Sequence, residues 1–142
     1  MLIIPTYNEG AATWVSRVRI SAGDESILFV DDNSPDGTAD RIRSIQGNDP
    51  HIHLMVRPGK AGYGSACREA MEKVLSEGLA DHITQFDADP VHDMTAGFVG
   101  YQAAVLRKIE LDQISSEGAH SLVSRENLKC RDMRWGRWAW CG

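Results

Sequence analysis

Four short runs of β-favouring residues alternate with helical stretches, and this alternation constrains the fold more than any other feature. The runs cover residues 2–4, 27–30, 52–56 and 82–86. Apolar residues recur at helical spacing between them, over residues 13–20, 38–45 and 64–76. In the third helical stretch, Glu69 and Lys73 are spaced for a favourable ion pair. Strand alternating with helix predicts a parallel sheet covered by helices.

The length and charge of the chain narrow the classes of protein to which it can belong. Its 142 residues are typical of one domain and are few for two. Hydrophobic residues make up 42% and charged residues 25%, which is typical of a globular chain rather than of a disordered or fibrous one. The formal net charge is −5, whereas sequence-independent binding to nucleic acid needs a cationic surface. We therefore expect no nucleic-acid partner.

Cysteine usage and hydropathy predict a cytoplasmic protein. The three cysteines are widely spaced and form neither a zinc pattern nor a disulfide framework, so a reducing compartment is expected. No apolar run approaches the roughly 18–20 residues of a membrane span, and residues 1–5 lack the features of a signal peptide. Any membrane contact would be peripheral, at the cytoplasmic face, or made through a membrane partner subunit.

The loops that follow the strands are the expected functional site, because ligands of parallel sheets bind at the carboxyl ends of the strands. In the first loop, Tyr7 could stack on a base and Glu9 could bind a base or ribose edge. The loop lacks the glycine-rich turn of a dinucleotide site. The alternative is that Asn8 caps the next helix and Tyr7 simply packs.

The second loop begins with two adjacent acids, Asp31 and Asp32. Turn chemistry explains residues 35–38, where Asp36 or Thr38 could cap the next helix. It does not explain two acids at the edge of a strand. A carboxylate at this position can accept hydrogen bonds from a ribose or a base, so the pair is a candidate for nucleoside recognition.

The third and fourth loops offer groups for an anionic ligand. Residues 57–64 form a basic, glycine-rich loop that opens a helix, where backbone N–H groups suit an anion; a flexible turn is the alternative. Asp87 and Asp89 directly follow an apolar strand. Two carboxylates at this spacing suit a hard divalent cation that also holds substrate phosphates, with a solvated turn as the alternative. Together the four loops predict a metal-assisted nucleotide-sugar site.

These segments occur in a specific order. They are Ile-Ile-Pro-Thr-Tyr-Asn-Glu at 3–9, Val-Asp-Asp-Asn-Ser-Pro-Asp-Gly-Thr at 30–38, Arg-Pro-Gly-Lys-Ala-Gly-Tyr-Gly at 57–64 and Asp-Ala-Asp at 87–89. In this combination the chain resembles the dolichyl-phosphate (polyprenyl-phosphate) mannosyltransferase group of the family 2 glycosyltransferases. Further similarity at 93–98, Tyr101 and 116–118 extends the resemblance over most of residues 2–118.

The resemblance implies a GT-A (Rossmann-like) nucleotide-sugar-binding fold of class α/β, a mostly parallel sheet with helices on both faces. It implies inverting transfer of mannose from GDP-mannose to a dolichyl or polyprenyl phosphate, assisted by Mg²⁺ or Mn²⁺. The donor-binding positions carried over are Pro5, Tyr7, Glu9, Val30, Asp32, Asp87, Ala88 and Asp89. Lys60 of the basic loop joins them as a candidate for the anionic donor.

The resemblance also assigns the metal and the catalytic residue. Asp87 and Asp89 would hold the metal, which would neutralise the charge that develops on the leaving diphosphate. Asp89 is therefore the catalytic candidate. The acceptor phosphate is already an anion at neutral pH, so no general base is named.

The chain departs from the family pattern after Asp89, where a sizeable segment of the family is missing. We expect one truncated domain over residues 1–118, with the donor half in 1–93 and a remnant of the acceptor half in 94–118, followed by an irregular tail over 119–142. Residues 94–109 are expected to form a turn and then a helix that has lost part of its packing surface.

Two alternatives to the transferase stay open. The chain could be a remnant that binds a nucleotide sugar without transferring it, or a related transferase that uses UDP-glucose. A further hypothesis is a structural or defective product that folds only with a partner, and metal-dependent nucleotide affinity separates the enzyme and the binding remnant from it. Sugar transfer to a lipid phosphate separates an enzyme from a binding remnant.

Overall fold

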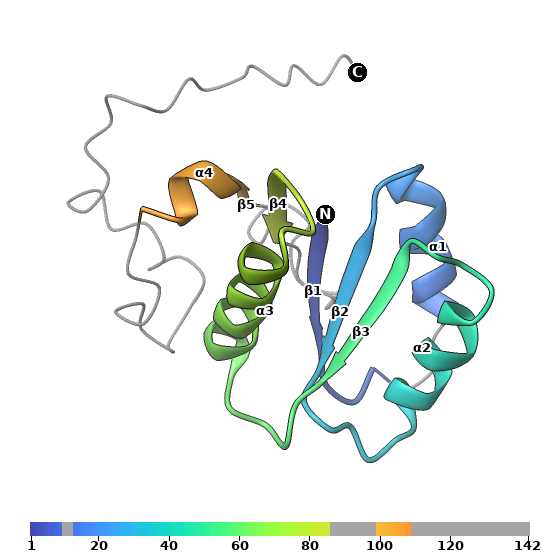
Figure 1. The fold of residues 1–142 in the computed structure, drawn as a ribbon. Coiled ribbons are helices and arrows are strands. Elements are labelled where there is room, and N and C mark those ends of the chain that lie inside the picture. Colours follow the sequence, from blue (N-terminus) through green and yellow to red (C-terminus); the bar gives the residue numbers. More distant parts are fainter. Residues whose placement is uncertain (10–12, 86–98, 109–142) are drawn as a thin grey trace, which may run out of the picture.

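The computed structural model describes residues 1–9, 13–85 and 99–108. Over these ranges the chain forms one five-stranded sheet of order β3-β2-β1-β4-β5, with helices on both faces (Figure 1). The strands are β1 (Leu2–Thr6), β2 (Ile27–Asp31), β3 (Ile52–Val56), β4 (His82–Gln85) and β5 (Val99–Gln102). The helices are α1 (Thr13–Ala22), α2 (Thr38–Gln46), α3 (Tyr63–Glu77) and α4 (Ala103–Leu106).

The first four strands run parallel, as the alternation of strands and helices predicts. β1 lies at the centre and pairs with β2 on one side and β4 on the other, while β2 also pairs with β3. Parallel neighbours need a crossover connection, and helices supply it. The predicted mostly parallel, helix-flanked sheet is confirmed. Each of the seven predicted strands and helices in residues 1–86 forms within two residues of its expected bounds.

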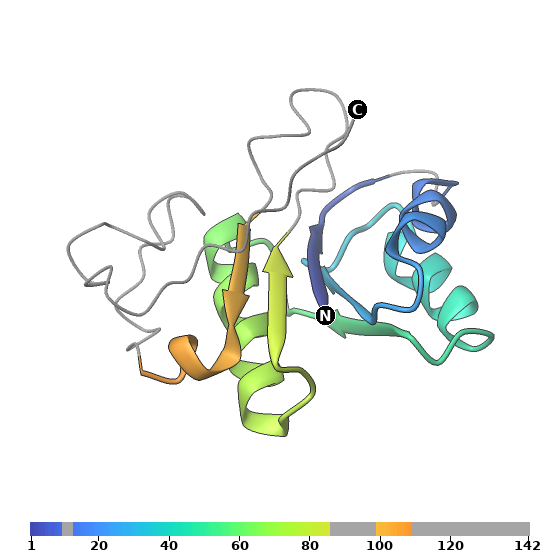
Figure 2. The ribbon, with the colours of Figure 1, turned by 90° about the horizontal axis from the view of Figure 1, so that it is seen from above.

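Strand alternation gives each face of the sheet its own hydrophobic core. On one face the helix α3 packs against strand side chains that include Ile3, Val30 and Ile83. On the other face α1 and α2 cover Ile4 and Phe29. Figure 2 shows α3 and α4 on one side of the sheet and α1 and α2 on the other. The side chains of adjacent strand residues therefore enter different environments.

The prediction of a turn and then a helix over residues 94–109 is wrong for residues 99–102, which form a strand. Val99–Gln102 forms β5, which pairs antiparallel with β4, and only Ala103–Leu106 is helical. Val99 and Tyr101 favour strand conformation, and pairing satisfies backbone groups that the edge of β4 would otherwise leave open. Tyr101 lies opposite Ile83 and packs against the core beneath α3. Strand pairing across the chain thus prevails over the local helical spacing.

Several expectations concern residues outside the described ranges. The domain boundaries expected at residues 93 and 118, and the tail over 119–142, fall there and stay predictions. Within the described ranges, no helix is both long enough and apolar enough to cross a membrane.

Candidate functional site

The loops after β1, β2 and β3 lie side by side at the carboxyl edge of the sheet. The Asn8 backbone N–H donates to Ser34 Oγ at 3.0 Å and joins the first loop to the second. The Asn33 side-chain amide donates to the Pro58 carbonyl at 3.4 Å and joins the second loop to the third. Parallel strands that neighbour one another end at the same edge, so the topology brings these distant segments together. Such an edge is where a ligand of an α/β sheet is expected.

Asp31 holds the second loop in shape. Its side chain is fully buried. Its carboxylate accepts hydrogen bonds from Thr6 Oγ1 at 3.1 Å, from the Ser34 backbone N–H at 2.8 Å and from Ser34 Oγ at 2.6 Å. A buried carboxylate needs such partners, and all three come from neighbouring loop and strand residues. Asp31 therefore has a structural role, and Asp32 is the acid of the pair that belongs to the site.

The turn predicted at residues 35–38 forms, but the N-cap residue of α2 is Gly37 rather than Asp36 or Thr38. Asp36 Oδ1 accepts hydrogen bonds from the Thr38 backbone N–H at 3.0 Å and from Thr38 Oγ1 at 2.6 Å, where α2 begins. Gly37 has a φ of 85°, a left-handed conformation that glycine adopts without steric cost. Turn chemistry explains these residues, and no ligand is needed to account for them.

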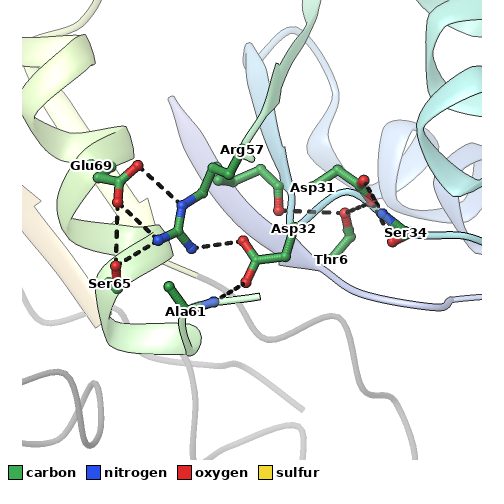
Figure 3. A network of polar contacts seen from close by, with 9 residues as sticks. Thr6, Asp31, Asp32, Ser34, Arg57, Ala61, Ser65 and Glu69 are labelled. Carbon is green, nitrogen blue, oxygen red and sulfur yellow. Dashed lines mark hydrogen bonds and ion pairs between the residues drawn. The ribbon is translucent and has the colours of Figure 1, made fainter. Parts of the chain in front are cut away.

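Asp32 belongs to a buried polar network centred on Arg57 (Figure 3). Arg57 Nη1 donates to Asp32 Oδ1 at 2.6 Å. Nη2 donates to Ser65 Oγ at 2.6 Å and to Glu69 Oε1 at 2.8 Å, and Nε donates to Glu69 Oε2 at 3.0 Å. The side chains of Arg57 and Asp32 are only 3% and 7% exposed. We call Asp32, Arg57, Ser65 and Glu69 the Arg57 network.

The charges of the Arg57 network stabilise one another. Burial by itself would lower the pKa of Arg57, but hydrogen bonding to Glu69 and the nearby charge of Asp32 outweigh burial and raise it. Hydrogen bonding from Arg57 lowers the pKa of Glu69. The predicted pairing of Glu69 with Lys73 is wrong, because Arg57 takes Glu69 while Lys73 pairs with Glu77. A guanidinium with its planar fork can bind two carboxylates and a hydroxyl at once, so Glu69 turns inward.

Tyr7 and Lys60 bring the first and third loops into contact. Lys60 Nζ lies 4.3 Å from the centroid of the Tyr7 ring, a cation–π contact, and Tyr7 is 36% exposed. The neighbouring backbone N–H of Ala61 donates to Asp32 Oδ2 at 3.2 Å. The third loop therefore touches both an aromatic ring and a carboxylate that the sequence assigns to the nucleoside.

The remaining predicted site residues occupy different positions. Pro5 is buried in β1, and Val30 is fully buried in the core beneath α3. Glu9 is half-buried at the end of the first loop. The fourth loop, with Asp87, Ala88 and Asp89, lies outside the described residues. β4 runs parallel to β1 toward the same edge of the sheet and is described as far as Gln85.

The metal prediction concerns the fourth loop alone. Within residues 1–9, 13–85 and 99–108, no group of three or more His, Cys, Asp and Glu side chains could hold a metal ion. Asp87 and Asp89 stay predicted metal ligands.

Sequence reasoning does not identify Arg57, Ser65 and Glu69 as individual site residues. A sequence signal does exist, since Ser65 and Glu69 are four residues apart and share one face of α3. Arg57 directly follows an apolar strand, where a lone charge near the core needs partners. Only the packing of α3 against the sheet shows that Arg57 joins Ser65 and Glu69 to Asp32.

Within the described residues, two buried polar side chains on β4 and β5 have no hydrogen-bond partner. They are the Gln85 amide, which is fully buried, and the Tyr101 hydroxyl. Burial raises the pKa of Tyr101 to about 12. Gln85 is two residues after Ile83 and so shares its face of the sheet, the face that α3 covers.

Two curated relatives match most of the chain. The undecaprenyl-phosphate mannosyltransferase of Micrococcus luteus is 27% identical over 176 residues, which cover 83% of this chain and 72% of the relative. The polyprenol monophosphomannose synthase of Mycolicibacterium smegmatis is 27% identical over 178 residues, which cover 83% of this chain and 67% of that relative. The matched 83% of this chain is about 118 residues, fewer than the 176 aligned positions.

Two solved structures also resemble part of the chain. They are the mannosyltransferase PcManGT from Pyrobaculum calidifontis in complex with GDP-Man and Mn²⁺, at 24% identity and a TM-score of 0.49, and residues 1–349 of S. aureus TarS, at 20% identity and a TM-score of 0.46. Each match covers 62% of this chain and 26% of the other. The chain thus spans about a quarter of the length of these solved proteins.

The sequence family described as "Glycosyl transferase family 2" matches residues 1–108. This match covers most of the chain and includes the three described loops at the carboxyl edge of the sheet as well as the sequence of the fourth loop. The mostly parallel sheet with helices on both faces is the architecture expected of a GT-A fold. The chain is therefore a GT-A member of glycosyl transferase family 2.

Proposed function

We propose that this chain binds GDP-mannose at the carboxyl edge of its sheet and transfers mannose to a polyprenyl phosphate, assisted by Mg²⁺ or Mn²⁺. The observation that carries the proposal is the contact among three loops, which brings Tyr7, Asp32 and Lys60 together. An aromatic ring, a carboxylate and a cation are the groups that a nucleoside diphosphate needs. The names of the two curated relatives supply the class of sugar and acceptor.

The nucleoside would bind over the first two loops. Tyr7 offers an exposed ring on which a base can stack. Asp32 and Glu9 would accept hydrogen bonds from base or ribose, while Pro5 and Val30 would support the nucleoside pocket from the strands beneath it. Lys60 now lies over the Tyr7 ring. A base that takes this face of Tyr7 would displace the Lys60 ammonium group, which is then free to turn toward the donor phosphates.

The diphosphate would bind between the third and fourth loops. The third loop opens the fifteen-residue helix α3, and backbone N–H groups at a helix start favour an anion. Asp87 and Asp89 would hold the metal, with Ala88 between them beside the diphosphate. Two carboxylates suit Mg²⁺ or Mn²⁺ because both are hard cations that prefer oxygen ligands. When bound, the metal would neutralise the charge that develops on the leaving GDP, and Asp89 is catalytic in this sense.

The proposed transfer is a single displacement with inversion. An oxygen of the acceptor phosphate would attack the anomeric carbon of mannose and form the new bond. The bond from that carbon to the donor diphosphate oxygen would break, and GDP would leave with the electron pair. The acceptor phosphate is ionised at neutral pH and has no proton to lose, so no side chain has to act as a base. The acceptor lipid implies peripheral contact with a membrane or with a membrane partner subunit.

Thermal melts of the purified chain test the donor site. We expect a cooperative melt that shifts upward with GDP-mannose plus Mn²⁺, and not with UDP-glucose plus Mn²⁺ or with GDP-mannose and a chelator. A ligand at 100 times its dissociation constant stabilises the folded state by about 2.7 kcal/mol, which a melt resolves easily. A shift with UDP-glucose alone would favour the related glucose transferase. A cooperative melt that no donor moves would rule out the donor site.

A transfer assay tests the reaction itself. Incubation with GDP-mannose, Mn²⁺ and a polyprenyl phosphate in detergent should yield a mannosyl lipid with inverted anomeric configuration. Asp89→Asn should abolish product while leaving the melt of the free chain cooperative. Donor binding without any product would identify the chain as a nucleotide-sugar-binding remnant.

A further inference from the structure

Nearly all hydrogen-bond donors of the Arg57 side chain bind other residues of the protein. Its four side-chain hydrogen bonds, to Asp32, Ser65 and twice to Glu69, use four of the five N–H groups of a guanidinium. Its backbone N–H also donates to the Asp31 carbonyl at 2.8 Å, which fixes the start of the third loop to the end of β2. Because the Arg57 side chain is only 3% exposed, it has little capacity to bind a ligand directly. Its effect on a ligand must pass through the residues that it holds.

Asp32 is the member of the Arg57 network that lies toward the loops. Oδ1 accepts from Arg57 and Oδ2 accepts from the Ala61 backbone N–H, so the carboxylate is held at two points and cannot rotate freely. Each carboxylate oxygen has two acceptor positions, and the described residues leave one on each oxygen for a ligand. A buried acceptor of fixed orientation rejects ligands that lack the matching donor, because it would then stay unpaired.

Ser65 and Glu69 of α3 set the orientation of Arg57. They are one helical turn apart and both bind Nη2, while Glu69 also binds Nε. The guanidinium plane is therefore fixed from the helix side, and Nη1 is left facing Asp32. Arg57 carries one positive charge and pairs with two carboxylates, those of Asp32 and Glu69. The three side chains together therefore keep a net negative charge.

We propose that Arg57 is a positioning residue: held by Ser65 and Glu69, it orients the Asp32 carboxylate toward hydrogen-bond donors on the nucleoside of the sugar donor. Asp32 meets the nucleoside only under the function proposed above, so this role rests on that function. Arg57 thereby determines how well the site distinguishes one nucleoside from another. The donors that Asp32 accepts are a base N–H or a ribose hydroxyl.

Calorimetric titrations of the full chain test this role. The ligands are GDP, inosine diphosphate, which lacks the exocyclic amine of guanine, and the 2′-deoxy and 3′-deoxy forms of GDP, all with Mn²⁺. In the native chain the analogue that lacks the group facing Asp32 should bind at least about tenfold more weakly than GDP, because a hydrogen bond to a charged group contributes more than the 1.4 kcal/mol that corresponds to a factor of ten. In Arg57→Lys, which keeps the charge but loses the planar fork, this ratio should fall toward one.

The ratio distinguishes positioning from a structural role. If Arg57 only supports the fold, Arg57→Lys raises every dissociation constant by the same factor and leaves the ratio unchanged, which would overturn the inference. Equal binding of all four ligands by the native chain would also overturn it. Absence of GDP binding by the native chain would instead refute the proposed function itself. In an Asp32→Asn background, Arg57→Lys should have no further effect on the ratio, because the two residues act as one unit.

Two further variants keep the test decisive if Arg57→Lys does not fold. Ser65→Ala removes one hydrogen bond from Arg57 and leaves both ion pairs in place, and it should lower the ratio about twofold to tenfold. Arg19→Lys is the matched control, because Arg19 pairs with Asp49 at 2.6 Å, and the two side chains are 20% and 23% exposed. Arg19 lies on α1, outside the loops of the site. A loss of discrimination in Arg19→Lys equal to that in Ser65→Ala would overturn the inference.

Discussion

Replacing Gln85, the last residue of β4, by methionine should stabilise the protein. Gln85 is fully buried, and neither polar atom of its amide has a hydrogen-bond partner among the residues that the structure describes. An unpartnered buried polar group costs about 1–3 kcal/mol, and methionine has a similar length and volume without that cost. We therefore expect the free energy of unfolding to rise by about 1–3 kcal/mol. For a chain of 142 residues each kcal/mol corresponds to about 4 °C in melting temperature.

Urea denaturation followed by circular dichroism measures this change, with a calorimetric melt as a second readout. The matched control is Gln102→Met, since Gln102 lies on the neighbouring strand β5 but is exposed. An exposed substitution of this kind should change the free energy of unfolding by no more than about 0.5 kcal/mol. The difference between the two variants isolates the effect of burying an unpartnered amide.

Loss of stability in Gln85→Met by more than about 1 kcal/mol would refute the reasoning, because it would mean that the amide has a partner in solution. The same variant also bears on the site, since Gln85 is two residues before Asp87. If Gln85→Met gains stability but loses affinity for GDP-mannose, the amide contacts the donor. Equal donor affinity would assign Gln85 no part in binding.

Four further predictions follow from individual contacts. Asp31→Ala should destabilise the fold by about 2–4 kcal/mol in urea titrations, because three hydrogen bonds to a buried carboxylate are lost; a change below about 0.5 kcal/mol would contradict its structural role. The pKa of Glu69 is lower in the folded state than its unfolded value of 4.5, so the ionised side chain stabilises the native state above pH 4.5. This stabilisation is lost as the pH falls below 4.5 and through the folded pKa. The difference in the free energy of unfolding between the native chain and Glu69→Gln should therefore shrink below that pH. Tyr101→Phe should remove the ultraviolet tyrosinate step near pH 12, and loss of a step near pH 10 instead would show that the Tyr101 hydroxyl is exposed to water. Tyr7→Ala should weaken GDP-mannose binding about tenfold in calorimetry if base stacking contributes about 1–3 kcal/mol, while Tyr7→Phe should retain it.

The arrangement of strands and helices could be read from the sequence because its signal is local. Apolar residues at period two or at helical spacing identify strands and helices one by one, and the bounds agree within two residues through the end of α3. β5 is the exception. Residues 99–102 have a spacing that also suits a helix, and the free edge of β4 decides in favour of a strand.

The loops of the candidate site could also be located from the sequence, because parallel strands bring their carboxyl ends to one edge. The contact of Tyr7 with Lys60, and of Asp32 with the third loop, agrees with that prediction. The metal ligands Asp87 and Asp89 lie outside the described residues and stay predictions.

The sequence by itself determined that this chain forms a mostly parallel sheet covered by helices and that the loops after β1, β2 and β3 meet at its edge. Only the tertiary structure decided what the individual side chains do there. Asp31 and Asp32 are neighbours in the chain, yet one holds the second loop and the other binds Arg57. Periodicity is a property of a short segment, whereas partners such as Arg57 and Glu69 depend on how a helix packs against a sheet. That packing is fixed by contacts between distant segments, which no local pattern contains.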